Sequence, residues 1–444
     1  MHRTPRFTSA LLAFGLATAS QSSWAGYTFE DGDLSGELSL VAGGATVSAR
    51  NINFGLGRTD LRSGENLGKE ATWQELYVKP KVVFDYKLNP DVSLLAGGSA
   101  VAASTFGDGD AGGFTRSSDG RASVEEAFAG FRAGNWKLTA GRQDYMIGTG
   151  FIVMDGNLDA FGDGAYWLGP RTAFRDSVLL AWDGGSAQAQ AFSLATDDHL
   201  GDYRLTGANL DYDLNGSVVL GAMAMKVDAL EGHTPARAAR DGMQVYNVRA
   251  LKGKVPGLPA LTLTGEYAVQ RGSGDGVDYD ANAWYAQADY MIESLPFTPT
   301  LGYRYTHFSG DSNPADNRQK SWDLLSKGFV DWGTWLLGDV VGNYLLFNTN
   351  ENVHQFSIKN RLSDTLTMGV IHYQFSLDEK FYQGVAVDSR RFADETAVFV
   401  DWTPTPRLYT SLSYNWVNAK AAAKQVFGDD ERFSALELYF IYRY

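Results

Sequence analysis

Arg171 and Arg175 are the residues of this sequence whose surroundings most clearly suggest chemistry. They follow six glycines between Gly148 and Gly169, and four aspartates lie beside them: Asp155, Asp159, Asp163 and Asp176. Arginine binds anionic groups through a planar fork of N–H donors, and glycine permits the sharp bends of a loop that folds into a cavity. The segment predicts a loop that carries arginines into a narrow passage, with a structural loop anchor as the alternative. Arg142, in the preceding GRQD, could pair with the same cluster.

Further basic residues recur at alternate positions of short segments, so that one face of a strand would carry them. These candidates are Lys79, Lys81, Lys87, Arg132, Lys137, Arg249, Arg304, Lys359, Arg361 and Arg443. Acidic candidates on the same faces are Asp85, Asp211, Asp213, Glu266, Asp289 and Glu437. Because the charge that lines a pore sets its selectivity, the modest basic excess predicts a path for anionic solutes. The alternative is a network of ion pairs that only neutralises buried charge.

Catalytic and metal-binding chemistry find less support. Five histidines follow residue 25, namely His199, His233, His307, His354 and His372, and no nucleophile motif accompanies them. The acidic runs GDGDAGG at 107–113 and GDGVDYDAN at 274–282 lack the ligand spacing of a calcium loop. We therefore predict no catalytic residues, no metal and no cofactor.

Composition and the first residues indicate an exported chain. The 444 residues contain no cysteine and carry a net charge of −14, which argues against a disulfide scaffold and a nucleic-acid partner. Residues 1–25 combine two arginines, the apolar run FTSALLAFGLATA and a small-x-small site ending at Ala25. This pattern is typical of a secretory signal peptide. No later segment is apolar over the length of a membrane-spanning helix, so residues 26–444 are either a secreted protein or a barrel.

Period-two alternation favours the barrel. In LYVKPKVVFDYKL at 76–88, Leu76, Val78, Val82 and Phe84 share one face, while Lys79 and its neighbours share the other. The alternation lasts for the 9–11 residues that a tilted membrane strand needs, according to the general geometry. Short turns such as Asn89-Pro90-Asp91 alternate with long polar loops, as in outer-membrane barrels. FSALELYFIYRY at 433–444 resembles the C-terminal signal read by the bacterial barrel-assembly machinery.

Counting from both ends predicts an all-β, antiparallel up-and-down barrel of about 18 strands. The predicted spans are 34–50, 74–88, 92–104, 122–133, 136–144, 174–183, 186–195, 204–213, 217–227, 242–252, 260–270, 281–292, 299–308, 354–362, 365–376, 394–402, 408–418 and 433–444. Strand number must be even if both ends lie in the periplasm. Parity therefore makes residues 309–353 one long external loop, although part of it is apolar enough to be a strand.

This long loop is predicted to fold into the lumen and narrow it. It is too rich in leucine and aromatic residues to extend into solvent, and SWDLLSKGF at 321–329 could form a helical turn or two. Trp332 and Trp335 are its candidates for lining the constriction. The alternative is an exposed hairpin above the membrane.

The chain resembles the alginate-export family of outer-membrane barrels. GRQDYMIGTGF at 141–151, GAYWLGPRTAF at 164–174 and WGTWLLGDVVGNYLLFNTN at 332–350 carry the resemblance. It implies a monomeric eighteen-stranded barrel in which a folded-in loop gates passage of a polyuronate through an arginine-rich lumen. The lumen predicted here is less basic than that, so we carry over the channel role and leave the substrate open.

The sequence thus predicts a porin-like channel for anionic sugars, polysaccharide or other small polar solutes. Its expected surroundings are outer-membrane lipid and lipopolysaccharide. The alternatives are an outer-membrane enzyme and a structural barrel with a closed lumen.

Overall fold

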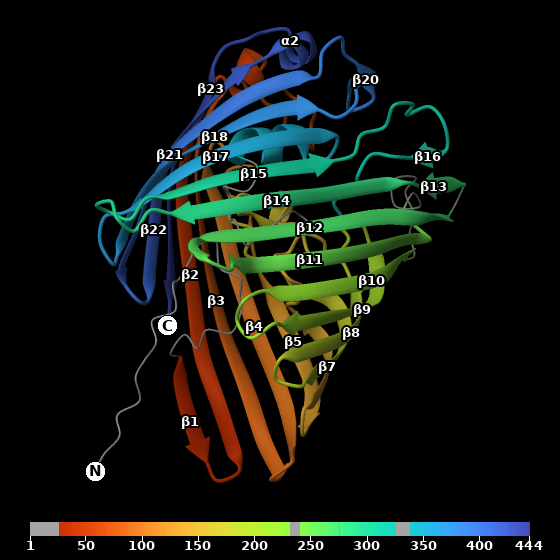
Figure 1. Cartoon of the computed structure of the whole chain (residues 1–444), viewed down its shortest axis with the longest axis vertical. Coiled ribbons are helices and arrows are strands. Elements are labelled where there is room, and N and C mark those ends of the chain that lie inside the picture. The colour runs from red at the N-terminus through yellow and green to blue at the C-terminus, as the bar shows by residue number, and fades with distance from the viewer. Residues whose placement is uncertain (1–25, 231–239, 275, 326–337) are drawn as a thin grey trace.

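A computed structural model shows a closed antiparallel β-barrel (Figure 1). It describes residues 26–230, 240–274, 276–325 and 338–444. The predicted signal peptide at 1–25, His233, Trp332 and Trp335 lie outside the described residues. Within these ranges, eighteen strands form the barrel wall, which confirms the predicted count. They are β2 (Leu34–Arg50), β3 (Glu70–Asn89), β4 (Val92–Gly107), β5 (Gly120–Ala133), β6 (Trp136–Gln143), β7 (Phe174–Asp183), β8 (Ala187–Ala195), β9 (Tyr203–Asp213), β10 (Val219–Ala229), β11 (Met243–Val255), β12 (Leu258–Gly274), β14 (Ala281–Met291), β15 (Thr300–Phe308), β17 (Glu351–Arg361), β18 (Leu366–Leu377), β21 (Arg391–Thr405), β22 (Leu408–Ala419) and β23 (Phe433–Arg443).

Alternation along each strand separates the two surfaces of the wall. On β3 the apolar side chains of Leu76, Phe84 and Tyr86 are exposed on the outside of the barrel, whereas Trp73 and Glu75 are buried inside. An exposed apolar exterior with polar groups inside is the arrangement that a lipid bilayer stabilises. The outside of the barrel is therefore its lipid-contacting surface.

The seam between β2 and β23 closes the ring. Their register runs from Val41 opposite Arg443 to Arg50 opposite Ser434. Beyond it, the Leu40 and Tyr444 backbones exchange two hydrogen bonds of 2.8 Å each. Closure leaves no wall strand with an unpaired edge among the described residues, as a membrane barrel requires.

Several small elements outside the wall were not predicted. β1 (Tyr27–Asp31) pairs with the first residues of β2. β13 (Val277–Tyr279) pairs with β16 (Arg318–Gln319), and β19 (Phe381–Tyr382) pairs with β20 (Val385–Ala386). The helix α2 (Ala421–Phe427) and the short turns η1 (Ile52–Gly55) and η2 (Phe161–Asp163) complete the loops.

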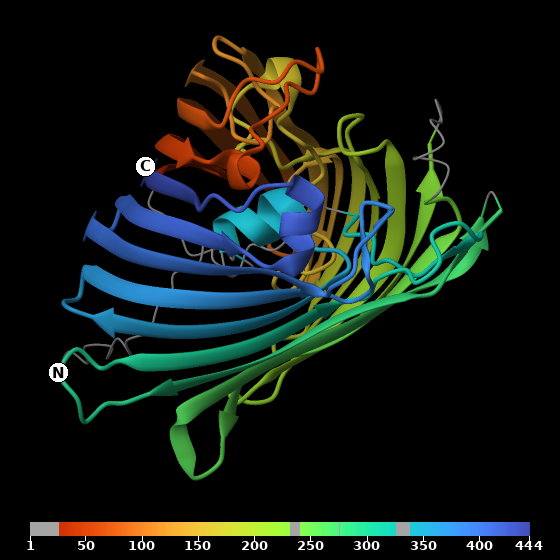
Figure 2. The same cartoon turned by 90° about the horizontal axis from the view of Figure 1, so that it is seen from above.

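The connection between β15 and β17 contains no barrel strand in its described parts. Residues 321–325 are irregular and show no helical turn, while residues 326–329 of the predicted turn in SWDLLSKGF lie outside the described residues. Helical structure occurs later, in η4 (Gly338–Leu346), which has i to i+5 hydrogen bonding. Viewed from above, η4 lies inside the ring of strands, against β21 and β22 (Figure 2). These residues therefore do not form the alternative exposed hairpin.

The described part of the chain holds no helix with the length and apolar character needed to cross a membrane.

Candidate functional site in the barrel lumen

The connection between β6 and β7, residues 144–173, reaches the opposite wall of the barrel. Thr149 donates a hydrogen bond of 2.5 Å from Oγ1 to Oε1 of Glu266 on β12. Gly148 lies directly against the Arg249 guanidinium on β11, and its φ of +57° belongs to the left-handed region that glycine favours. A side chain at Gly148 would meet Arg249 at 2.9 Å. The glycine-rich composition thus lets this segment contact the far wall closely.

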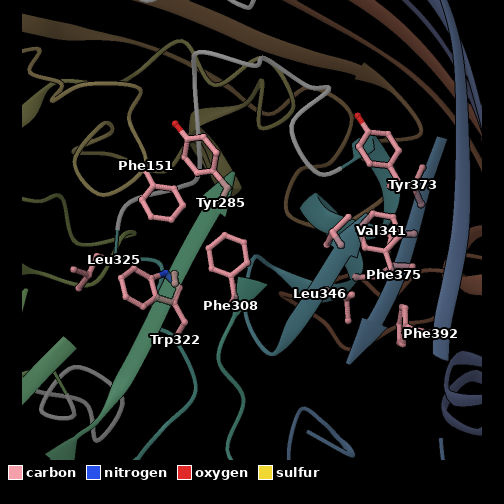
Figure 3. Packing of buried hydrophobic residues seen from close by; sticks show 14 of the residues in the cluster. Phe151, Tyr285, Phe308, Trp322, Leu325, Val341, Leu346, Tyr373, Phe375 and Phe392 are labelled. Atoms are coloured by element: carbon pink, nitrogen blue, oxygen red, sulfur yellow. The ribbon is translucent and has the colours of Figure 1, made fainter. Parts of the chain in front are cut away.

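Aromatic packing holds the tip of the 144–173 segment in place. The Phe151 ring lies 5.4 Å from that of Tyr285 and 6.1 Å from that of Phe308, both on the wall. Its centroid is 6.4 Å from the ring of Trp322, in the connection between β15 and β17 (Figure 3). The two infolded connections therefore contact each other inside the barrel.

Two wall glutamates hold the returning half of the 144–173 segment. Glu75 on β3 accepts hydrogen bonds from the backbone N–H groups of Trp167 (3.2 Å) and Leu168 (2.8 Å). Glu125 on β5 accepts from those of Thr172 (2.8 Å) and Ala173 (3.0 Å). Both carboxylates are fully buried. A buried carboxyl group is stable only when it is paired or hydrogen-bonded, so these glutamates and the segment stabilise each other.

Arg171 is a structural anchor of the segment. Its guanidinium is 2% exposed and lies 2.6 Å from Oδ1 of Asp159, which is completely buried. It also donates to the carbonyls of Asp163 (3.1 Å) and Arg121 (2.7 Å). These contacts occupy the donors that a passing solute would need. Sequence reasoning left both roles open, and the geometry favours the anchor.

The wall holds η4 in the same way. Glu395 on β21 is fully buried and accepts hydrogen bonds from the backbone N–H groups of Val340 (3.3 Å) and Val341 (2.9 Å). Tyr382 donates from its hydroxyl to the carbonyl of Leu345 (3.0 Å). The apolar side of this region faces Tyr373, Phe375 and Phe392 (Figure 3).

Most predicted basic candidates on the β3–β5 wall are paired with acids. Lys79 lies 3.1 Å from Glu125 and 3.4 Å from Asp144. Lys81 lies 2.8 Å from Glu126, and Arg132 lies 2.7 Å from Asp85. Pairing reduces the field that each cation projects into the lumen.

Lys137 and Arg142 on β6 differ from these pairs. Arg142 donates to the backbone carbonyl of Glu125 (2.8 Å), and no described carboxylate pairs with its guanidinium. Lys137 is cross-strand neighbour to Arg132 and has no ion pair with a described acid. β6 therefore carries positive charge that neighbouring acids do not neutralise.

The remaining candidates lie apart from β6. Arg249 is buried on β11 and pairs with Asp211 at 2.5 Å. Arg304 on β15 donates to Gln287 (2.9 Å), and Lys359 lies on β17. Arg361 lies at the short-turn end of β17, where it pairs with Asp364 at 2.9 Å.

Arg175, at the start of β7, holds the neighbouring loop. It lies 3.0 Å from Asp198 and 2.8 Å from Asp202. Beside it, His199 lies 3.3 Å from Asp163 of the infolded segment. The loop at 196–202 is thus tied to the 144–173 segment by ionisable groups outside the strands.

The hydrogen bond to Asp163 raises the pKa of His199 above its ordinary value. Burial alone would raise the pKa of Asp163, but the hydrogen bond from His199 and the charges of Arg171 and Arg121 lower it overall. The raised pKa of His199 therefore stabilises the folded state fully below about pH 6.5, and this stabilisation is lost as pH rises through the folded-state pKa. The lowered pKa of Asp163 stabilises the folded state above about pH 4, and this stabilisation is lost as pH falls through that lowered pKa.

We expect an NMR titration to place the pKa of His199 above about 6.5, the value of an unperturbed histidine. Replacing Asp163 with asparagine should bring it back toward that value. A His199 pKa that is the same with and without the Asp163 carboxylate would contradict this pairing.

His307 and His354 lie on the outward-facing side of β15 and β17, where they make local contacts. His307 lies 2.7 Å from Oδ1 of Asn352, and His354 lies 3.0 Å from the Tyr303 hydroxyl. Across the described ranges no three acidic or histidine side chains gather in a group that could hold a metal ion.

The wall glutamates Glu75, Glu125 and Glu395 are the site residues that sequence reasoning missed. Glu75 and Glu395 are each a single acid among apolar or aromatic lumen-facing neighbours on their strands, as in Trp73-x-Glu75, whereas Glu125 lies beside Glu126. That isolation is a usable signal, because a buried acid needs a partner from elsewhere in the chain.

Comparisons with known proteins concern the fold. No family model and no curated protein matches the chain. The crystal structure of Acinetobacter baumannii OccAB2 is similar to it with a TM-score of 0.60 and 12% identity, over 92% of this chain and 98% of that one. Pseudomonas aeruginosa OccK8 (OprE) gives a TM-score of 0.60 and 10% identity, and the P. aeruginosa outer membrane protein opdK gives 0.56 and 15%, with the same two coverages. The eighteen-stranded fold and its apolar exterior assign the chain to the bacterial outer membrane.

Proposed function

We propose that this chain is an outer-membrane channel through which small polar solutes diffuse, and that it favours anionic ones. The observation that carries the proposal is the pair of infolded connections held inside an eighteen-stranded wall. A barrel of this size has room for an aqueous passage. The Thr149–Glu266 contact and the Glu395 contacts of η4 place chain segments across and along that passage.

The preference for anions rests on β6 and its neighbours. Lys137 has no ion pair with a described acid, and its cross-strand neighbour Arg132 adds a second cation. Arg142, at the loop end of β6, pairs with Ala127 on the outward face of the wall. A local positive field raises the concentration of anions at a pore and lowers that of cations.

Replacing Lys137 with glutamine should reduce the anion-to-cation permeability ratio by roughly twofold, because lining charge sets pore selectivity. Reversal potentials across a planar bilayer under a salt gradient measure this ratio. The wild-type channel should show the higher ratio, and the difference should shrink in concentrated salt as the charges are screened.

Arg361→Gln is the matched control, since this exposed arginine lies at the short-turn end and already pairs with Asp364. It should leave the ratio unchanged. No detectable conductance from the reconstituted chain would contradict the channel itself. Conductance without any effect of Lys137→Gln would contradict only the anion preference.

A further inference from the structure

A cavity at the loop end of the barrel is separate from the wall that carries the basic residues. It has a volume of about 330 Å³ and lies between three segments: residues 311–324, residues 345–350 and the β19–β20 hairpin. This volume is within the range of small-molecule sites in general. A second cavity of about 140 Å³ adjoins it and shares the lining residues Asp311, Pro314, Gln319 and Ser321.

Hydrogen bonds between the three segments give the larger cavity a fixed shape. Asn350 donates to the carbonyls of Glu379 (3.2 Å) and Phe381 (2.6 Å), and its Oδ1 accepts from the Glu379 N–H (2.7 Å). Thr349 donates to the carbonyl of Trp322 (2.7 Å). A preformed site loses little ordering entropy when a ligand enters.

The charged side chains that line the larger cavity already make ion pairs or hydrogen bonds within the protein. Arg240 makes a bidentate contact with Asp323, at 2.7 and 2.9 Å, and its guanidinium also lies over the Tyr203 ring. Asp311 accepts hydrogen bonds from the backbone N–H groups of Asn313 (2.8 Å) and Lys320 (3.3 Å). Among the described lining residues, no unneutralised cation is therefore available to an anionic ligand.

Uncharged hydrogen-bonding groups and aromatic surface remain for a ligand. Gln383, on the exposed tip of the hairpin, makes no side-chain hydrogen bond with the described residues, and the same is true of the Ser321 hydroxyl. Phe381 and Phe347 are half-buried and add ring surface. Hydroxyl-binding amides beside aromatic carbon match a ligand that has a polar rim and apolar C–H faces.

We propose that these adjoining cavities form a binding site for a sugar ring, and that a second linked ring occupies the smaller cavity. The larger cavity recognises ring hydroxyls through Gln383 and Ser321, and Phe381 contacts the ring face. This site selects a ligand by its uncharged hydroxyl groups, whereas the basic side chain of Lys137 on β6 selects a solute by its charge. The site does not depend on the proposed channel, since a barrel with a closed lumen would still bind sugar here.

Isothermal titration calorimetry of the folded barrel in detergent tests this site, with maltose, glucose and glucuronate as the probes. We expect maltose to bind more tightly than glucose, and glucuronate to bind no more tightly than glucose. Gln383→Ala and Phe381→Ala should each weaken maltose binding by roughly tenfold, as expected for loss of one good contact. Val385→Ala is the matched control, because this exposed side chain on the same hairpin does not line either cavity.

The site would be overturned by absence of maltose binding to the wild-type barrel, or by binding that neither replacement weakens. Tighter binding of glucuronate than of glucose would also overturn it, because the lining would then be selecting charge. Equal binding of glucose and maltose would overturn the role of the smaller cavity. Circular dichroism of both variants establishes that the barrel is folded in each comparison.

Discussion

Replacing Arg171 with methionine should release the 144–173 segment from the lumen. The Asp159 carboxylate is completely buried and would lose the guanidinium that lies 2.6 Å away. Removing one partner of a buried ion pair costs about 3–5 kcal/mol, because the remaining charge is left in a poorly solvating environment. The free energy that holds the segment in place should fall by about this amount.

Limited proteolysis with chymotrypsin measures the release. Between Asp144 and Pro170 the segment contains no lysine or arginine, but Phe151, Phe161, Tyr166 and Trp167 offer chymotrypsin sites. Cleavage in this segment should be slow in the wild-type barrel and fast in Arg171→Met.

The double replacement Arg171→Met, Asp159→Asn is the control for this mechanism. It removes the uncompensated charge as well as the guanidinium, so it should recover part of the protection. Arg175→Met should have a smaller effect, since Arg175 is more than a third exposed and solvent screens its pairs. If Arg171→Met is cleaved as slowly as the wild type, Arg171 does not anchor the segment.

Replacing Glu395 with leucine should loosen η4 and widen the passage. The Glu395 carboxylate accepts two backbone N–H groups of η4, and hydrogen bonds to a charged group contribute about 1.5–3 kcal/mol each. Leucine preserves bulk but accepts neither bond, so the first turn of η4 loses its link to the wall. Single-channel conductance should rise by roughly twofold, because an eighteen-stranded barrel without infolded segments leaves a wide aqueous channel.

Glu351→Leu is the matched control for Glu395→Leu. Glu351 is an equally buried wall glutamate on β17, but neither of its carboxylate oxygens has a hydrogen-bond partner among the described residues. Its replacement removes a buried acid that holds no segment, so conductance should not change. Equal conductance changes in the two variants would show that the Glu395 contacts do not set the width of the passage.

The sequence predicted the wall far better than it predicted the contents of the lumen. Alternation such as that of Leu76, Val78 and Phe84 identifies the lipid-facing side directly, because successive side chains of every wall strand point to opposite faces. Parity then placed the apolar 309–353 segment outside the wall. The β3 strand begins four residues earlier than predicted, at Glu70, because Ala71 and Trp73 continue the inward face above the predicted start.

Period-two alternation does not assign side chains to the correct face where the hydrogen-bond register between two strands shifts. A register shift between Ser99 and Ala100 leaves Glu125 as an extra residue on β5, so Glu125 and Glu126 both point into the barrel. A β-bulge changes the direction of the side chains in this way, and its position cannot be predicted from residue type. Strict alternation would have placed one of these two glutamates on the lipid-facing side of β5.

The loop anchors could not be predicted because their partners are distant backbone groups. Glu75 and the Leu168 N–H are 93 residues apart, and any residue can supply an N–H. Arg171 and Asp159 lie in one loop and were recognisable as a cluster. Only the structure distinguishes a buried pair from arginines that face a solute.

The seam between β2 and β23 has a consequence for the order of assembly. Its two strands come from opposite ends of the described chain, so the ring stays open until almost all of the chain has been made. Contacts this distant in sequence form late in folding. Trp167 of the 144–173 segment packs its ring 5.8 Å from that of Tyr439 on β23. This contact forms only once β23 is in place, so the last strand of the wall also completes the packing of the 144–173 segment.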